Sequence, residues 1–166
     1  MTDTRCFRTS NTTPELFRTA TLLMEHGASL PDVTEAVFQH NSPSRICLWG
    51  KALSAAQIES GIVWTQVSQE MVQACQASSY DDQGLANFLD ATHDIGVAIV
   101  FREKNAEQIE VSMRAARGVD VSGVALSMGG GGHPQAAGCT CTGSLAEVQE
   151  RVLGAVKKAL QEQGHR

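Results

Sequence analysis

Four consecutive glycines, Gly129–Gly132, stand directly before His133 and Pro134 in the run GGGGHPQAAGC. Because glycine has no Cβ, such a backbone can take left-handed conformations and approach a ligand closely. Successive exposed N–H groups then favour an anion, and an imidazole can donate to a phosphate oxygen or act as an acid near neutral pH. Pro134 suits the first turn of a short helix, whose N-terminus would favour the same anion. The run predicts a phosphate-binding loop, with a flexible linker as the alternative.

A second group of chemically useful residues lies in the stretch 108–114, where apolar and polar residues alternate as in a half-buried strand. Ile109, Val111 and Met113 would face the core, which turns Ser112 and Arg114 to the other face. A guanidinium at this strand end can hold a phosphate through two hydrogen bonds. The spacing alone gives equal weight to a solvent-exposed strand end. Arg102 and Glu103, which end the preceding strand, fit either a site or ordinary surface.

Metal-ligating residues are sparse. Metal-assisted phosphoryl transfer needs several carboxylates and histidines that converge on one point. Beyond the single carboxylate of Asp3, the sequence has no HxxxH, no DxD and no paired His/Asp cluster. Asp81 and Asp82 precede a predicted helix, where a capping role is favoured. The sequence therefore predicts no self-contained metal catalyst.

Composition limits the classes of partner. A formal charge of −5 and a pI near 5.5 argue against an extended surface for duplex nucleic acid, but they leave room for a pocket that binds a short or terminal phosphate. Five scattered cysteines indicate a reducing, cytoplasmic compartment. We expect Cys139 and Cys141 on opposite faces of a strand. No apolar run approaches the length of a membrane span, so no membrane partner is expected.

The predicted elements change character near Gly61. Before it we expect three helices: one capped by Thr13 and ending at Gly27, one from Ser29 to His40, and one that continues to about Ile58. The third helix should turn Ile46, Trp49, Leu53 and Ala56 inward. After it we expect strands at 62–67, 95–101, 108–114 and 138–142, with the middle two forming a hairpin. A last helix starts at the capping box of residues 144–147. The fold class is therefore α/β, with a mixed sheet in the second part.

The run GGGGHPQAAG resembles the signature of the DHH-associated C-terminal domain found in DHH-family phosphoesterases. Residues 111–114 resemble the family's strand ending in S-x-R, and residues 120–125 resemble its lead-in helix. The subgroup most similar in these motifs contains bacterial short-oligoribonucleases (nanoRNases) and phosphoadenosine-phosphate phosphatases. The opening MTDTRCFR resembles the fourth motif of the catalytic DHH domain, T-D-T-G-x-F, so Asp3 matches a metal-ligand aspartate. Arg5 stands where the family commonly has glycine.

The resemblance implies a domain order. Residues 1–42 would be the C-terminal remnant of the truncated catalytic DHH domain, 43–59 a connector helix, and 60–166 the DHH-associated nucleotide-binding or nucleic-acid-binding domain. The family's first three motifs, including Asp-His-His, are absent from this sequence and would lie upstream of Met1. They supply most ligands of a two-metal centre that usually holds manganese (Mn2+). The chain would then be the C-terminal half of such an enzyme, either truncated, started too late or a natural fragment, and inactive alone.

The resemblance also implies a substrate-binding set, which consists of Arg114, Gly130, Gly131, Gly132 and His133, with Ser112 as a weaker member. The expected ligand is a short single-stranded oligonucleotide or a small nucleotide, such as an oligoribonucleotide, phosphoadenosine phosphate or a cyclic dinucleotide. One alternative is a standalone, non-catalytic module that binds nucleotides or nucleic acid. Another is an inactive fragment whose exposed apolar helix faces promote aggregation or a homodimer.

Overall fold

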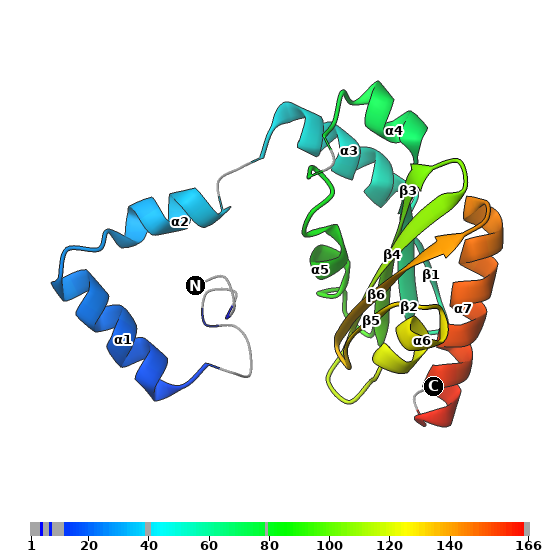
Figure 1. Ribbon diagram of the computed structural model, residues 1–166. Helices are drawn as coiled ribbons and strands as arrows, with labels where there is room; N and C mark the ends of the chain where they lie inside the picture. The colour runs from blue at the N-terminus through cyan, green and yellow to red at the C-terminus, as the bar shows by residue number, and fades with distance from the viewer. Residues whose placement is uncertain (1–3, 5–6, 8–11, 39–40, 79, 165–166) are drawn as a thin grey trace. The chain divides into compact units, whose positions relative to one another are not determined.

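The computed structural model describes residues 4, 7, 12–38, 41–78 and 80–164 (Figure 1). The chain divides into two compact units, Met1–Asn41 and Ser42–Arg166, and each is described by itself. The functional domains assigned to residues 1–42, 43–59 and 60–166 stay predictions. Among the described residues, no helix combines the length and the apolar character needed to cross a membrane.

The first unit contains the helices α1 (Pro14–Glu25) and α2 (Leu30–Phe38). The Thr13 hydroxyl accepts a hydrogen bond from the Leu16 N–H at 3.4 Å and caps α1. Gly27, at a φ of +95°, follows the end of α1. Both helices were predicted and are confirmed. Asp3 and His40 lie outside the described residues.

The second unit is built on a six-stranded sheet, counted over the described residues, with the order β1-β2-β3-β4-β6-β5. The strands are β1 (Gln57–Glu59), β2 (Ile62–Val67), β3 (Val97–Asn105), β4 (Gln108–Ala115), β5 (Gly131–His133) and β6 (Ala136–Thr142). Strands β2 and β3 are parallel, whereas the other neighbouring pairs are antiparallel. This confirms the predicted α/β class, the mixed sheet and the β3–β4 hairpin.

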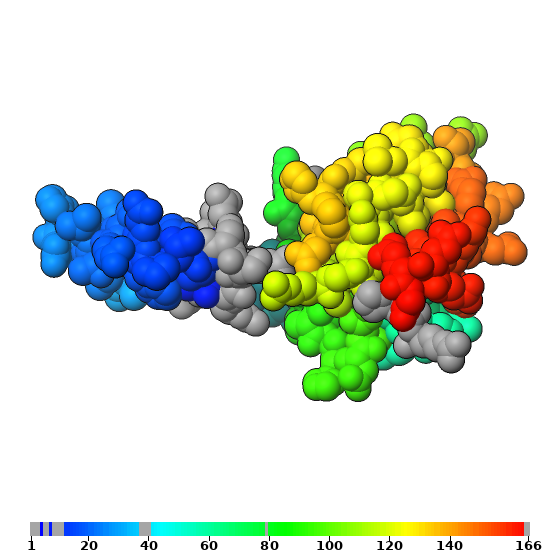
Figure 2. All heavy atoms as spheres, turned by 90° about the horizontal axis from the view of Figure 1, so that it is seen from below, coloured from blue at the N-terminus to red at the C-terminus, as the bar shows by residue number. Residues whose placement is uncertain are grey.

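Helices cover both faces of this sheet (Figure 1). They are α3 (Pro43–Ser54), α4 (Gln69–Ala74), α5 (Leu85–Leu89), α6 (Ser122–Ser127) and α7 (Leu145–Glu162). Helix α7 starts at the predicted capping box, in which Ser144 and Glu147 bond each other's backbone N–H. Figure 2 shows α6 in yellow beside the C-terminal end of α7 in red.

The sheet separates two apolar cores. Beneath α7, the side chains of Val148, Val152 and Val156 belong to one buried cluster with strand residues such as Phe101 and Met113. On the other face, α3 and α5 belong to a second cluster, which includes Leu48, Ala52, Leu85, Ala98 and Val100. The sheet is therefore fixed from both sides at β2 and β3.

The third helix differs from its prediction. It ends at Ser54 rather than near Ile58, and its fully buried side chains are Leu48 and Ala52. Of the residues expected to face inward, Trp49 and Leu53 are partly buried against the second core cluster, whereas Ile46 is exposed. Residues 57–59 form β1, which pairs with β2 across a turn at Ser60 and Gly61, with φ values of +52° and +73°. Two successive left-handed residues form the tight turn of a hairpin. Strand pairing across this turn outweighs the helical propensity of the residues before it.

The cysteines also differ from expectation. A disulfide joins Cys47 to Cys75, 28 residues apart, so the cysteine pattern no longer supports a reducing compartment. Cys139 and Cys141 are both buried on the same face of β6, with their Sγ atoms 3.6 Å apart. The prediction that they lie on opposite faces is wrong, because side chains two positions apart on a strand point to the same face. Burial and the hydrogen bond to Cys141 raise the pKa of the Cys139 thiol to about 12, so it stays protonated at neutral pH.

Candidate functional site

Strand β4 turns its polar side chains away from the core under α7. Ile109, Val111 and Met113 are buried there, as the alternation predicted. Ser112 and Arg114 are half-buried and belong to the opposite face of the sheet. Their direct partners on β3 are Val100 and Ala98, which belong to the core cluster shared with α3 and α5. Ser112 and Arg114 therefore lie on the α5 side of the sheet.

The glycine-rich segment joins this face through β6. Arg114 pairs with Ala136, and Ala136 pairs with His133. Directly paired residues point to the same face of a sheet, so Arg114 and His133 share one face on strands separated by a single strand. Neighbouring strands are about 4.8 Å apart, which places these two backbones about 10 Å apart.

A second row runs parallel to the first. Ser112 pairs with Gly138, which in turn pairs with Gly131. The structure thus brings Ser112, Arg114, Gly131 and His133 to one surface, which we call the open face.

The predicted glycines divide into two kinds. A Cβ on Gly130 would lie 2.1 Å from the Gly138 carbonyl oxygen, and a Cβ on Gly132 would lie 2.5 Å from that of Ala136. Gly132 also has a φ of +139°, which favours glycine. A Cβ on Gly131 would meet no atom within 4 Å. Close packing on β6 therefore requires glycine at positions 130 and 132, whereas position 131 faces open space.

The segment after His133 is a turn between two strands, so the expected helix at Pro134 is wrong. The Pro134 carbonyl accepts from the Val121 N–H at 2.9 Å, and the Gln135 carbonyl accepts from the Ala115 N–H at 3.1 Å. These bonds tie the turn to the start of α6 and the end of β4. The loop thus presents a strand edge and an exposed imidazole, and no helix begins at Pro134.

The guanidinium of Arg114 is oriented by two neutral groups. Its Nε donates to Asn87 Oδ1 at 2.8 Å, and its Nη1 donates to the Met113 carbonyl at 2.9 Å. These two contacts fix the direction of the side chain. Asn87 lies on α5 and was not predicted, since no local pattern links a helix residue to a strand 27 positions later.

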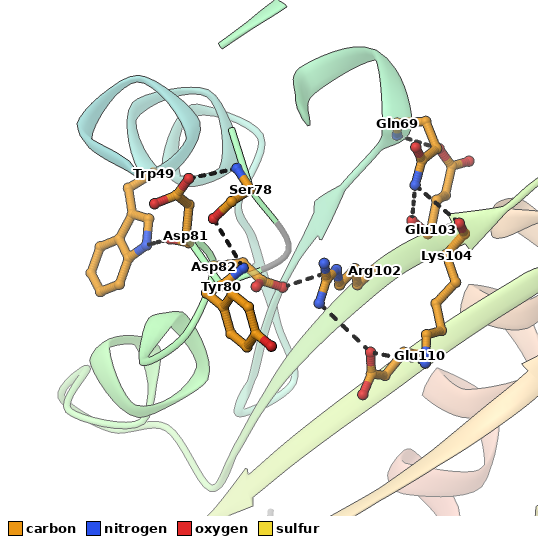
Figure 3. A network of polar contacts seen from close by, with 10 residues as sticks. All are labelled: Trp49, Gln69, Ser78, Tyr80, Asp81, Asp82, Arg102, Glu103, Lys104 and Glu110. Carbon is orange, nitrogen blue, oxygen red and sulfur yellow. Dashed lines mark hydrogen bonds and ion pairs between the residues drawn. The ribbon is translucent and has the colours of Figure 1, made fainter. Parts of the chain in front are cut away.

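A cavity of about 490 Å³ adjoins Ser112 and Arg114 on the α5 side of β3 and β4. Arg102 enters it and forms an ion pair with Asp82, Nε to Oδ2, at 3.4 Å (Figure 3). Glu110 lies 3.8 Å from Arg102 and 3.9 Å from Lys104, measured between their nearest charged atoms. The sequence left Arg102 open between site and surface, and the structure places it in this cavity. Glu103 instead accepts a hydrogen bond from the Gln69 N–H.

The two neighbouring aspartates do not cap α5, because Gly84 occupies its N-cap position. The Asp81 carboxylate accepts hydrogen bonds from the Ser78 N–H at 2.6 Å and from the hydroxyls of Ser42 and Ser44. The backbone bond from Ser78 is the main cause that lowers the pKa of Asp81. Burial raises the pKa of Asp82, and the charge of Arg102 opposes that rise.

A resident metal centre does not fit the described residues. No group of three or more His, Cys, Asp or Glu side chains among them could hold a metal ion. Asp3, the predicted ligand, lies outside the part of the chain that the structure describes. No metal-dependent step can be derived from the open face itself.

Comparison with known proteins agrees with this architecture. The model of the DHHA1 domain family matches residues 71–162. The bifunctional oligoribonuclease and PAP phosphatase NrnA of Thermus thermophilus is 36% identical over 166 residues, which cover 99% of this chain and 50% of that protein.

Two solved structures share the fold at lower identity. An exopolyphosphatase-related protein from Bacteroides fragilis matches with a TM-score of 0.92 and 22% identity, over 99% of this chain and 49% of that one. The pGpG-specific phosphodiesterase PggH from Vibrio cholerae matches with a TM-score of 0.50 and 12% identity, over 89% and 51%. The chain thus spans about half the length of these relatives. Since the family model matches more than half of the chain, including the glycine-rich strand and β4, this chain belongs to the DHHA1 domain family of DHH-type phosphoesterases.

Proposed function

We propose that this chain is the substrate-binding part of a metal-dependent phosphodiesterase or phosphatase that acts on short oligoribonucleotides or small nucleotides. The observation that carries the proposal is the open face, where Ser112, Arg114, Gly131 and His133 lie in two adjacent rows of paired residues. The name of the Thermus relative, an oligoribonuclease and PAP phosphatase, supports the same class of ligand.

Each residue of the open face has a distinct proposed role toward a terminal phosphate. The Arg114 guanidinium, oriented by Asn87, would form the charged hydrogen bonds. The Ser112 hydroxyl and the His133 ring would donate further hydrogen bonds. Gly131 would let a phosphate oxygen approach the backbone, while Gly130 and Gly132 keep β5 tightly packed on β6.

Hydrolysis would need groups beyond those described. We propose manganese as the metal, with Asp3 as one ligand and the others supplied by the half of the DHH relatives that this chain does not match. A metal of this kind activates water and polarises the scissile phosphate. The role of this chain's open face is to bind and orient the ligand. Homodimer formation also stays a proposal.

The test is calorimetric titration of the purified chain with phosphoadenosine phosphate and with the 5′-phosphorylated dinucleotide pApA. Arg114→Ala should weaken both affinities about tenfold or more, since hydrogen bonds to a charged group contribute about 1.5–3 kcal/mol. His133→Ala should weaken them several-fold. As a control, Lys158→Ala removes a side chain on α7 that is 76% exposed, and it should change nothing. Wild-type affinity in both site variants would contradict the proposed site.

A standalone, non-catalytic nucleotide-binding module is the second candidate. It requires only the open face, whose four residues all lie in the second unit. The two candidates differ in the reading frame that precedes this sequence in the genome. In-frame DxD-like and Asp-His-His motifs there support the substrate-binding part of a hydrolase, whereas a frame closed by stops well short of them supports the binding module.

A further inference from the structure

The disulfide between helices α3 and α4 joins two cysteines that differ in exposure. Cys47 lies on α3, and Cys75 is the residue that ends α4. Cys75 is only 7% exposed and belongs to the core cluster that contains Leu48 and Leu85. Cys47, in contrast, is exposed. A molecule in solution can therefore reach the disulfide from the Cys47 side, whereas the core covers the Cys75 side.

The exposed side of the disulfide borders a cavity of about 680 Å³ lined by residues of α3, α4 and β2, which we call the α3–α4 cavity. Cys47 lines it, and Cys75 is not among the described residues that do. Lys51, one turn after Cys47 on α3, and Glu70 on α4 give the lining one charge of each sign. The volume lies within the range of pockets that hold small ligands. A small molecule that carries both charges can therefore approach Cys47 here.

The unequal exposure gives thiol–disulfide exchange a direction, because access decides which sulfur a thiolate attacks. The thiolate of a small thiol bonds to the Cys47 Sγ, and the bond between the Cys47 and Cys75 sulfurs breaks. Its electron pair leaves on the Cys75 Sγ, which takes up the proton that the small thiol released. In the reverse direction, the Cys75 thiolate attacks the Cys47 Sγ and expels the small thiol. The adduct on Cys47 is therefore reversible.

Helix α4 has few other attachments at the end that carries the disulfide. The helix has six residues, and none of them is fully buried. Its first turn is held by the Ser68 hydroxyl, which accepts from the Met71 N–H at 3.2 Å, and by the Glu103 carboxylate, which accepts from the Gln69 N–H at 2.9 Å. The disulfide joins the last turn of α4 to α3. Opening it therefore removes the covalent attachment of the C-terminal end of α4.

The loop between α4 and α5 has its own attachments to α3. The Asp81 carbonyl accepts from Trp49 Nε1 at 2.9 Å (Figure 3), and the Gln83 carbonyl accepts from the Arg45 guanidinium. The Asp81 carboxylate also accepts from two serine hydroxyls at the start of α3. None of these bonds involves the disulfide. Helix α5, which carries Asn87, should therefore keep its place when the disulfide opens.

We propose that Cys47 is a site of reversible modification by a small thiol such as glutathione, and that Cys75 is the cysteine that later expels it. The modification detaches the C-terminal end of α4 from α3 and leaves α5 and β4 in place. This inference does not depend on the proposed function, because the disulfide and the α3–α4 cavity share no residue with the open face.

The first test measures how fast oxidised glutathione labels each cysteine, by acid quenching, digestion and mass spectrometry of the peptides. Cys6, which lies outside the described residues, is replaced by serine throughout. In the variant Cys75→Ser, Cys47 should be labelled at least about tenfold faster than Cys139 and Cys141, since labelling requires an accessible sulfur. Those two buried thiols are controls within the same chain. Labelling of Cys47 at their rate would overturn the proposal.

The second test concerns Cys75. The chain that retains both Cys47 and Cys75 is first reduced and then treated with oxidised glutathione. It should lose the adduct on Cys47 and regain the internal disulfide, whereas Cys75→Ser should keep its adduct over the same time. An adduct that is equally stable in the two chains would show that Cys75 does not expel the small thiol.

Amide hydrogen exchange tests the structural consequence. The oxidised and reduced chains are compared at short exposure times, which report local opening rather than global unfolding. The amides of residues 70–77 should exchange about tenfold faster or more in the reduced chain, because the end of α4 has lost its attachment. The amides of α5, β4 and α7 should be unchanged. Equal exchange of residues 70–77 in both states, or faster exchange that extends to α5 and β4, would overturn the proposed detachment of α4 alone.

Discussion

The two faces of strand β4 differ in the residue types that they carry and in how deeply those residues are buried. Ile109, Val111 and Met113, at most 1% exposed, pack into the core under α7. Ser112 and Arg114, on the opposite face, contribute no apolar side chain to either core cluster. The first face determines the fold, whereas the second is free to carry chemistry. A site on a central strand is also rigid, because the same strand is held from behind by the core.

Strand β5 repeats the comparison on a smaller scale. Gly130 and Gly132 are required because β6 leaves no room for a Cβ, whereas Gly131 faces open space. Of the four consecutive glycines, Gly130 and Gly132 are therefore structural positions, Gly129 has a left-handed φ of +77°, and Gly131 is available for a ligand.

The largest expected effect is a difference in unfolding free energy between substitutions on the two faces of β4. Met113→Ala should lower the free energy of unfolding by about 2–5 kcal/mol, because it leaves a cavity in the core. Ser112→Ala, one residue earlier, should change it by about 0.5 kcal/mol or less. Urea denaturation of both variants measures the difference. Equal losses would show that the two faces are not distinct in the way described.

A smaller difference in stability is expected between alanine substitutions at Gly130 and Gly131. Gly130→Ala forces a Cβ against the Gly138 carbonyl and should cost about 1–3 kcal/mol of stability. Gly131→Ala should leave the melting temperature near that of the wild type and weaken the binding of pApA. Thermal unfolding combined with titration checks both. A fully stable Gly130→Ala would contradict the tight packing of β5 on β6.

The smallest effect concerns the helices on the site side of the sheet. Asp81 ties the start of α3 to the loop before α5 through Ser42, Ser44 and Ser78. Asp81→Asn should cost about 1 kcal/mol at pH 7, given that water partly screens the site. Hydrogen bonding lowers the pKa of Asp81 in the folded protein, so the native state binds fewer protons than the unfolded one as the pH falls.

This stabilisation is therefore complete above the ordinary aspartate pKa of 3.8 and is lost progressively below it. The difference in unfolding free energy between the wild type and Asp81→Asn should shrink from pH 7 to pH 3. A difference that is constant over this range would mean that the carboxylate charge plays no part.

Local pattern was enough for much of the fold. The alternation in β4, the Ser144 capping box and the Thr13 cap each depend on residues within a few positions, and all three are confirmed. The motifs also identified the family. The hairpin turn at Ser60 and Gly61 was missed because the residues before it favour a helix when considered alone.

The remaining features depend on contacts between distant segments. The bond from Arg114 to Asn87 spans 27 positions, and the Cys47–Cys75 disulfide spans 28. The ion pair of Asp82 with Arg102 likewise joins a loop to a strand. No periodicity or capping pattern contains such information, since these pairs become neighbours only when the sheet has formed.

The central claim is that the ligand binds on the open face, and amide NMR of the purified chain tests it most directly. Titration with pApA should shift the resonances of Ser112, Arg114, Gly131 and His133 along one saturating curve. The amides of Val148 and Val152 on α7, behind the sheet, should stay in place. Shifts that cluster on α6 and α7, or saturable binding that leaves β4 and β5 unchanged, would contradict the account.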